Sequence, residues 1–327
     1  MKTNSLTMEA VARKAGVSIT TVSHVINKTR HVSQETMAAV LQAIEDLNYR
    51  SVKMIKSYKN ICIGVILADA REDFFTSLIK AVESVAADYG ASIIFCDSEM
   101  DTEKEEKNIA ALVERNINGL LLAPVEADHI PKFLRRTSVP IVLVDRQYES
   151  HDFLFVGINN FQSCYAGTKH LFEKGSRHIG FIGYSPSVYT IKQRILGYKA
   201  FMVDNSQPFI PKVLTLNYNR EDSSPLIKQF ILDEGLDGLI CATSALCYEL
   251  IAVLDTLDME TRKRMKIITF DDNRWFDYLK YPVSVISQPV AEIGNAAVEN
   301  LLQIIEQKNS LCSVKRELLF DTGIVGR

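Results

Sequence analysis

Residues 7–27 read TMEAVARKAGVSITTVSHVIN, and this stretch decides the first part of the fold. Thr7 can cap a helix whose apolar residues share one face, and Gly16 can end it. Ser18 can cap a second helix, in which Val22 and Val25 lie on one side and short polar residues on the other. Two short amphipathic helices joined by a tight turn are typical of a helix-turn-helix, which lays its second helix in the major groove of DNA.

A third helix is predicted to begin after Ser33. Its apolar residues recur at helical spacing and predict one stripe that packs on the first two helices: Met37, Val40, Leu41, Ile44 and Leu47. We therefore expect a small all-α domain over residues 1–49, followed by a linker over residues 50–60.

The distribution of charge agrees with a polyanionic partner for this domain. Residues 1–60 hold nine basic and four acidic side chains, so this segment carries +5 in a chain whose net charge is −3. The remainder carries −8. A basic head on an acidic body indicates that the head, and not the body, meets nucleic acid.

The polar surface of the second helix supplies the predicted DNA contacts. Side chains near its N-terminus that can reach base edges are Ser18, Ile19, Thr20 and His24. Groups that can hold phosphates are Thr7, Thr21, Ser23 and Asn27.

From Ile61 onward, short apolar runs alternate with amphipathic segments of helical length, which indicates doubly wound parallel sheets. The predicted strands are Ile63–Leu67, Ser92–Phe95, Leu120–Leu122, Ile141–Val144, Ile179–Ile182, Leu239–Cys241 and Ile267–Phe270. The predicted helices are 75–89, 103–116, 160–174, 189–203, 223–233 and 246–257. This number of strands predicts two α/β subdomains, with a ligand between them at the carboxyl ends of the strands.

Several function classes lack their sequence signals. The chain has no nucleophile elbow, Walker loop or strand-linked glycine fingerprint, and its histidines are dispersed, so we expect no catalytic residues, no metal and no cofactor. The six cysteines form no close pair, which is typical of reduced thiols in a cytoplasmic protein. No apolar run reaches the ~20 residues that span a bilayer, and we expect no signal peptide.

The head resembles the lac/galactose-repressor family of bacterial regulators. The run Thr20-Thr21-Val22-Ser23-His24-Val25-Ile26-Asn27-Lys28-Thr29-Arg30 is most similar to the purine-repressor branch, and Val32-Ser33-x-Glu35-Thr36 and Leu47-Asn48-Tyr49 also fit. The core resembles the periplasmic-binding-protein-like core of that family. Its matching landmarks are Asp73-Phe74-Phe75, Val144-Asp145-Arg146, Gly157-Ile158-Asn159-Asn160, Arg194-x2-Gly197-Tyr198, Phe270-Asp271-Asp272 and Ser287-Gln288-Pro289.

The resemblance implies a homodimeric repressor that binds double-stranded operator DNA and is controlled by a small-molecule effector. It implies an N-subdomain at about 61–159 plus 288–317 and a C-subdomain at about 160–287 plus 318–327. The apolar helix at 295–307 is a candidate dimerisation element. Where the family places a leucine that wedges into the minor groove, this chain has Tyr58, which could wedge or could pack on its dimer mate.

By resemblance, Arg194 and Asp271 are the leading effector contacts. Phe75 and Trp275 follow, and then Asp145. Phe74 is a further aromatic residue that could line the site. Paired hydrogen bonds from carboxylates and arginine, and ring faces, suit a sugar or another polyol. Other roles stay open: an ion pair of Asp145 with Arg146, helix-start packing for Phe74 or Phe75, and capping by Asp271. Thr243-Ser244 and Ser176 depart from the family pattern.

Three other functions remain open. The same DNA-binding protein could answer to a phosphorylated carrier protein instead of a small molecule. A secreted sugar-binding protein would share the core, but the basic head argues against this class. An α/β enzyme is the remote alternative. The sequence does not say whether an effector relieves or promotes repression.

Overall fold

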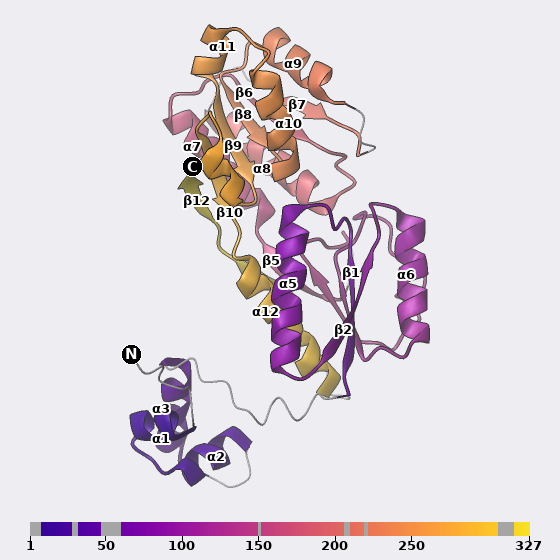
Figure 1. Ribbon diagram of the computed structural model, residues 1–327, viewed down its shortest axis with the longest axis vertical. Helices are drawn as coiled ribbons and strands as arrows, with labels where there is room; N and C mark the ends of the chain where they lie inside the picture. Colours follow the sequence, from indigo (N-terminus) through magenta and orange to yellow (C-terminus); the bar gives the residue numbers. More distant parts are fainter. Residues whose placement is uncertain are drawn as a thin grey trace. The chain divides into compact units, whose positions relative to one another are not determined.

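The computed structural model describes residues 8–27, 32–46, 60–149, 152–205, 210–218, 222–306 and 317–327. The chain forms two compact units, a head that runs to Ile61 and a core that occupies most of the chain from Cys62 onward (Figure 1). Each unit is described by itself.

The head contains α1 (Met8–Ala15), α2 (Ile19–Asn27) and α3 (Gln34–Asp46). Val11, Val22 and Val40 are fully buried where the three helices meet. Gly16 links α1 to α2 with a φ of +66°, a conformation that glycine adopts without strain. The Ser18 hydroxyl accepts the Thr21 N–H at 3.1 Å and caps α2. The predicted helix-turn-helix is confirmed.

The predicted apolar stripe of α3 is wrong in part. Met37 and Leu41 are 40% and 53% exposed, whereas Val40 and Ala43 are buried. At 100° per residue, the buried face of α3 centres between Val40 and Ala43, which places Met37 at its edge and turns Leu41 outward. An alanine at position 43 is small enough for close helix packing, and the stripe overlooked it because alanine is weakly apolar.

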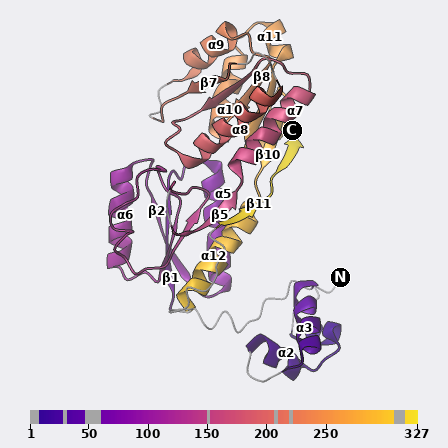
Figure 2. The ribbon, with the colours of Figure 1, turned by 180° about the vertical axis from the view of Figure 1, so that it is seen from behind.

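The N-lobe of the core is one parallel sheet with helices on both faces. Its strands are β1 (Cys62–Leu67), β2 (Ser92–Asp97), β3 (Gly119–Leu122), β4 (Ile141–Val144), β5 (Leu154–Ile158) and β11 (Glu317–Phe320), in the order β11-β5-β4-β3-β1-β2. Helix α6 (Thr102–Glu114) covers one face, and α5 (Asp73–Asp88) and α12 (Val290–Glu306) cover the other (Figures 1 and 2). Ala297, Leu301 and Leu302 of α12 are buried in this lobe, so they are not free to form a dimer contact.

The C-lobe repeats this architecture. Its strands are β6 (Ile179–Gly183), β7 (Lys212–Thr215), β8 (Gly238–Cys241), β9 (Lys266–Phe270), β10 (Val283–Ser287) and β12 (Gly323–Gly326), in the order β12-β10-β9-β8-β6-β7. β12 pairs antiparallel with β10. The helices are α7 (Asn160–Glu173), α8 (Tyr189–Asn205), α9 (Ser224–Asp233), α10 (Ser244–Leu254), α11 (Met259–Arg264) and the 3-10 helix η1 (Arg274–Tyr278).

Along the described residues, the chain passes between the lobes after β5, after β10 and between β11 and β12. Glu317–Phe320 pairs with β5 in the N-lobe sheet, and Gly323–Gly326 pairs with β10 in the C-lobe sheet. The two short terminal strands are edge strands and carry no strong apolar run, which is why the sequence did not predict them.

Removing the cap of α2 provides a local test of the head. We expect Ser18→Ala to destabilise α2 by about 1 kcal/mol, because the Thr21 N–H loses its acceptor. Hydrogen exchange of the full chain should therefore speed up at α2 amides by roughly five-fold. Ser33→Ala is the matched control, since Ser33 caps α3 through the Thr36 N–H at 3.3 Å and should affect α3 instead. Equal exchange at α2 in both variants would contradict this role for Ser18.

Candidate effector site and DNA-reading helix

Two aspartates occupy equivalent places in the two lobes. Asp145 follows β4 with a φ of +64°, and its N–H bonds to the Val156 carbonyl at 2.9 Å. Asp271 follows β9 with a φ of +70°, and its N–H bonds to the Ile286 carbonyl at 3.2 Å. A positive φ is uncommon for aspartate and is retained only where the surroundings enforce it. Both carboxylates therefore lie at carboxyl ends of parallel strands, where α/β proteins bind ligands.

Arg194 of α8 is buried and joins three elements of the C-lobe. Its Nε donates to Asn160 Oδ1 of α7 at 2.8 Å, and its Nη1 donates to the Ala242 carbonyl after β8. Its guanidinium lies over the Phe270 ring, with 3.6 Å between the Cζ atom and the ring centroid. These contacts fix the plane of the guanidinium, and they account for only part of its five N–H donors.

Charges of opposite sign surround this arginine. Burial raises the pKa of Asp145 to about 6, while the nearby Arg146 and Arg194 oppose that shift. Burial also raises the pKa of Asp271, against the opposing effect of Arg194 and of the Gln288 amide, which donates to Asp271 Oδ1 at 2.6 Å. Burial lowers the pKa of Arg194, and the two aspartates oppose that change. The Arg194 cluster, defined here as Asp145, Arg146, Asn160, Arg194, Asp271 and Gln288, therefore draws on both lobes.

Phe74 and Phe75 start α5 beside this cluster. Both are buried and their rings meet edge to face, with centroids 5.4 Å apart. The Arg146 guanidinium lies 5.2 Å from the Phe75 ring centroid and 3.7 Å from Asp145, so the ion pair weighed from the sequence is present. Phe75 thus contacts a member of the cluster, and Phe74 supports Phe75.

Trp275 is not brought into the cluster. Trp275 is 63% exposed, and its ring centroid lies 6.2 Å from that of Tyr278. The two departures from the family pattern have structural roles. The Thr243 hydroxyl accepts the Leu246 N–H at the start of α10, and the buried Ser176 hydroxyl donates to the Asp237 carbonyl.

The structure adds polar residues that sequence reasoning did not single out. Asn160 and Gln288 belong to quoted landmarks but were not proposed as contacts. Asn160 Nδ2 and Gln288 Oε1 are buried and have no hydrogen-bond partner within the described residues. Glu72 and Tyr218 gave no sequence signal, because their pairing joins positions 146 residues apart.

Hydrogen bonds link the lobes around the cluster. Tyr218 after β7 donates to Glu72 Oε1 at 3.1 Å, and Asn273 Nδ2 donates to Asp73 Oδ2 at 2.6 Å. Gln147 Nε2 donates to the Tyr189 hydroxyl at 2.7 Å. A ligand that binds here is therefore placed to change how the lobes contact each other.

In the head, Ser18, Ile19 and Thr20 are exposed at the N-terminus of α2, as predicted for residues that reach base edges. Thr21 is half-buried, and its hydroxyl lies 2.8 Å from that of Ser18. Thr7 and Tyr58 lie outside the described residues, as do the side chains of Ser23, His24 and Asn27. The predicted contacts of these five stay predictions.

No group of three or more metal-ligating side chains gathers in the described part of the core or head. No helix along the described ranges has both the length and the apolar character to cross a membrane.

Comparison with known proteins assigns both units. Residues 7–51 match the family model described as bacterial regulatory proteins, lacI family, and residues 63–309 match a periplasmic binding protein domain. The HTH-type transcriptional regulator RegA of Clostridium saccharobutylicum is 29% identical over 91% of this chain and 92% of its own length. The HTH-type transcriptional repressor PurR of Haemophilus influenzae (strain PittEE) is 30% identical over 93% of this chain and 92% of its own.

Among solved structures, the lac repressor dimer bound to operator and the anti-inducer ONPF has the same fold. It superposes with a TM-score of 0.69 at 21% identity, over 98% of this chain and 97% of that one. The relatives are regulators and not enzymes, and the match therefore argues against the α/β enzyme alternative. The chain belongs to the lacI family of bacterial regulatory proteins and is a DNA-binding transcriptional regulator.

Proposed function

We propose that this protein is a homodimeric repressor whose hold on double-stranded operator DNA is set by a small carbohydrate-like effector at the Arg194 cluster. One observation carries the effector proposal: a buried arginine lies among buried carboxylates from both lobes, and two buried amides there, Asn160 and Gln288, each keep one polar atom without a partner in the described residues. Burial of unpaired polar groups costs free energy, and a bound polyol supplies both donors and acceptors to satisfy them.

The mechanism follows from the contacts between the lobes. An effector that bonds to Arg194 and Asp271 in the C-lobe and to Asp145 in the N-lobe favours one separation of the lobes over another. Only such a difference in affinity shifts the balance between states that bind DNA and states that do not. The lac repressor dimer and the repressor name of PurR support a dimer and repression. We place this action in the cytoplasm, on nucleoid DNA.

The test measures effector binding and DNA binding in the same protein. Sugars, sugar acids, sugar phosphates and purine bases are screened by thermal shift, and an operator selected from random duplexes is followed by fluorescence anisotropy. A ligand at ~100 times its dissociation constant should stabilise the protein by about 2.7 kcal/mol. The same ligand should change operator affinity, and Arg194→Lys should lose both responses because lysine lacks the planar fork.

A panel in which nothing shifts the melting temperature or the operator affinity would remove the small-molecule input. The phosphorylated carrier protein would then become the leading effector, and a pull-down with such a carrier would be the next measurement.

His24→Ala tests the predicted base contact of α2. We expect discrimination at one base pair of the operator to fall by roughly 1–3 kcal/mol, because that side chain is predicted to face a base edge. Binding of selected operator variants by anisotropy gives the preference at each position. Gln42→Ala on α3 is the control, since Gln42 is exposed and bonds within its own helix to Asp46. An unchanged preference would remove His24 from the base-reading residues.

A further inference from the structure

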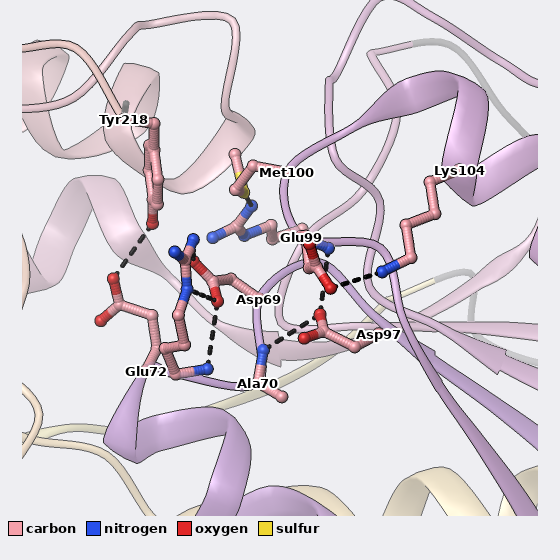
Figure 3. A network of polar contacts seen from close by, with 10 residues as sticks. Asp69, Ala70, Glu72, Asp97, Glu99, Met100, Lys104 and Tyr218 are labelled. Atoms are coloured by element: carbon pink, nitrogen blue, oxygen red, sulfur yellow. Dashed lines mark hydrogen bonds and ion pairs between the residues drawn. The ribbon is translucent and has the colours of Figure 1, made fainter. Parts of the chain in front are cut away.

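A second set of carboxylates lies between β1 and the first residue of α5, and Figure 3 shows two of them, Asp69 and Glu72. Glu72 is near Asp271 and Arg146 of the Arg194 cluster. Asp69 is buried and is held by Arg71, with 2.6 Å from Nε to Oδ1 and 2.5 Å from Nη2 to Oδ2. Glu72 is buried and accepts the Tyr218 hydroxyl. Asp73 accepts the Asn273 amide. Within the described residues, neither Glu72 nor Asp73 forms an ion pair.

The charges around this point do not balance. Arg71 offsets Asp69, Arg146 lies 3.7 Å from Asp145, and Arg194 opposes the charge of Asp271. Two further carboxylates, Glu72 and Asp73, have no basic partner of their own. The N-terminus of α5 contributes a partial positive charge of about half a unit, which is less than the two carboxylates carry. The side chains around this point therefore carry an excess of negative charge.

This excess of negative charge destabilises the ionised form of Glu72. Burial, together with the nearby charge of Asp271, raises its pKa to about 7, and Tyr218 and Arg146 act in the opposite direction. The charged and titratable groups that act on Glu72 are Asp69, Asp271, Arg146, Tyr218 and Tyr184. A buried carboxyl group with this environment gains most from a cation placed beside it.

An independent observation indicates that a ligand belongs here. Asn160 is 2% exposed and Gln288 is 8% exposed, yet a donor on the first and an acceptor on the second have no partner among the described residues. Asn160 Oδ1 is already bonded to Arg194, and Gln288 Nε2 to Asp271, so the free atoms belong to the same cluster. A hydroxyl group can accept from one amide and donate to the other.

We propose that the effector is a cationic amino polyol of the amino-sugar class, with its ammonium group against Glu72 and its hydroxyl groups on the Arg194 cluster. The inference rests on the proposed function and narrows it. Sugar phosphates and sugar acids would add negative charge to a site that already has too much, so the site rejects them. Tyr184 and Tyr218, whose ring centroids are 3.9 Å apart, provide an aromatic surface beside Glu72 that also suits a cation.

This arrangement links effector binding to the protonation state of Glu72. An ammonium group beside Glu72 favours the ionised carboxylate and lowers its pKa. At pH 7 the unliganded group is about half protonated, so binding should release up to about half a proton for each ligand bound. A neutral sugar or a sugar phosphate at the same place would not release this proton.

Isothermal titration calorimetry of the full chain tests the proposal. The probes are glucosamine, galactosamine and mannosamine, each paired with its neutral N-acetyl derivative, plus glucose and glucose 6-phosphate. Titrations are run at pH 7 in two buffers that differ in ionisation enthalpy and contain no primary amine. We expect one amino sugar to bind at least ten-fold more tightly than its N-acetyl partner, with an enthalpy difference between buffers that reports proton release.

Variants separate the charge of Glu72 from its structural role. Glu72→Gln keeps an oxygen for the Tyr218 hydroxyl but removes the charge, so the preference for the amine and the proton release should both disappear. Tyr218→Phe removes the hydrogen bond and keeps the carboxylate, so the preference should remain. Glu83→Gln changes an exposed glutamate on the same helix and should change neither quantity. Far-ultraviolet circular dichroism and a cooperative melting transition confirm that each variant is folded.

Three outcomes overturn the proposal. If glucose or glucose 6-phosphate binds more tightly than every amino sugar and depends on Arg194, the proposed function stands and the amine assignment falls. If an amino sugar binds without releasing a proton, Glu72 is not its partner and the assignment falls. If no probe in the panel binds, the amine assignment falls, and the wider small-molecule panel then decides the proposed function.

Discussion

Arg194→Met is expected to lower the free energy of unfolding of the core by about 3–5 kcal/mol. Methionine fills much of the same space but leaves Asp145 and Asp271 buried without their shared cation. It also leaves Asn160 Oδ1 and the Ala242 carbonyl without their donors. Urea unfolding followed by far-ultraviolet circular dichroism at pH 7 measures the change.

A second substitution tests the cause of this loss. If the unpaired charge is the main cost, Asp271→Asn in the Arg194→Met background should recover stability, and the two changes should be strongly non-additive. Arg194→Lys keeps a cation and should cost less than methionine, although lysine cannot reach both acceptors at once. Additive effects of Arg194→Met and Asp271→Asn would mean that the arginine stabilises the core through packing and not through charge.

The sequence predicted most of the fold because the strands of a doubly wound sheet are continuous apolar runs. β4 was predicted at its observed bounds, and β1, β6, β8 and β9 within one residue at each end. β5 and β10 are also apolar, but each lies where the chain changes lobe and the strand–helix alternation is interrupted. The edge strands β7, β11 and β12 are short and partly exposed, so composition does not mark them.

The site was less predictable, because it depends on which chain segments meet. Resemblance predicts Arg194, Asp145 and Asp271 as effector contacts, and in the structure the three side chains interact electrostatically. Trp275 was an attractive candidate because its residue type binds sugars, but η1 turns it toward solvent. Glu72 and Tyr218 belong to different lobes, and no local pattern predicts that their side chains meet. Charge balance at a site is likewise a property of the assembled fold.

Glu105→Gln is expected to make the core more stable at pH 8 and to change it little at pH 4.5. Glu105 of α6 is fully buried, and its Oε2 accepts the Val125 N–H at 2.7 Å. Burial raises its pKa to about 7, above the value of 4.5 for a free glutamate. The native state therefore favours the protonated form, and this contribution to stability is full below pH 4.5.

As the pH rises from 4.5 through 7, the buried carboxyl group must ionise, and the wild-type core loses about 3 kcal/mol from this residue. Glutamine keeps an oxygen for the Val125 N–H and never ionises, so its advantage should grow over that range and level off above pH 7. Urea unfolding of both proteins from pH 4.5 to 8 gives the difference, which cancels the contribution of Glu72. Glu103→Gln, an exposed change on the same helix, should give a curve parallel to the wild type. A parallel curve for Glu105→Gln would show that water or a rearrangement already relieves the buried charge.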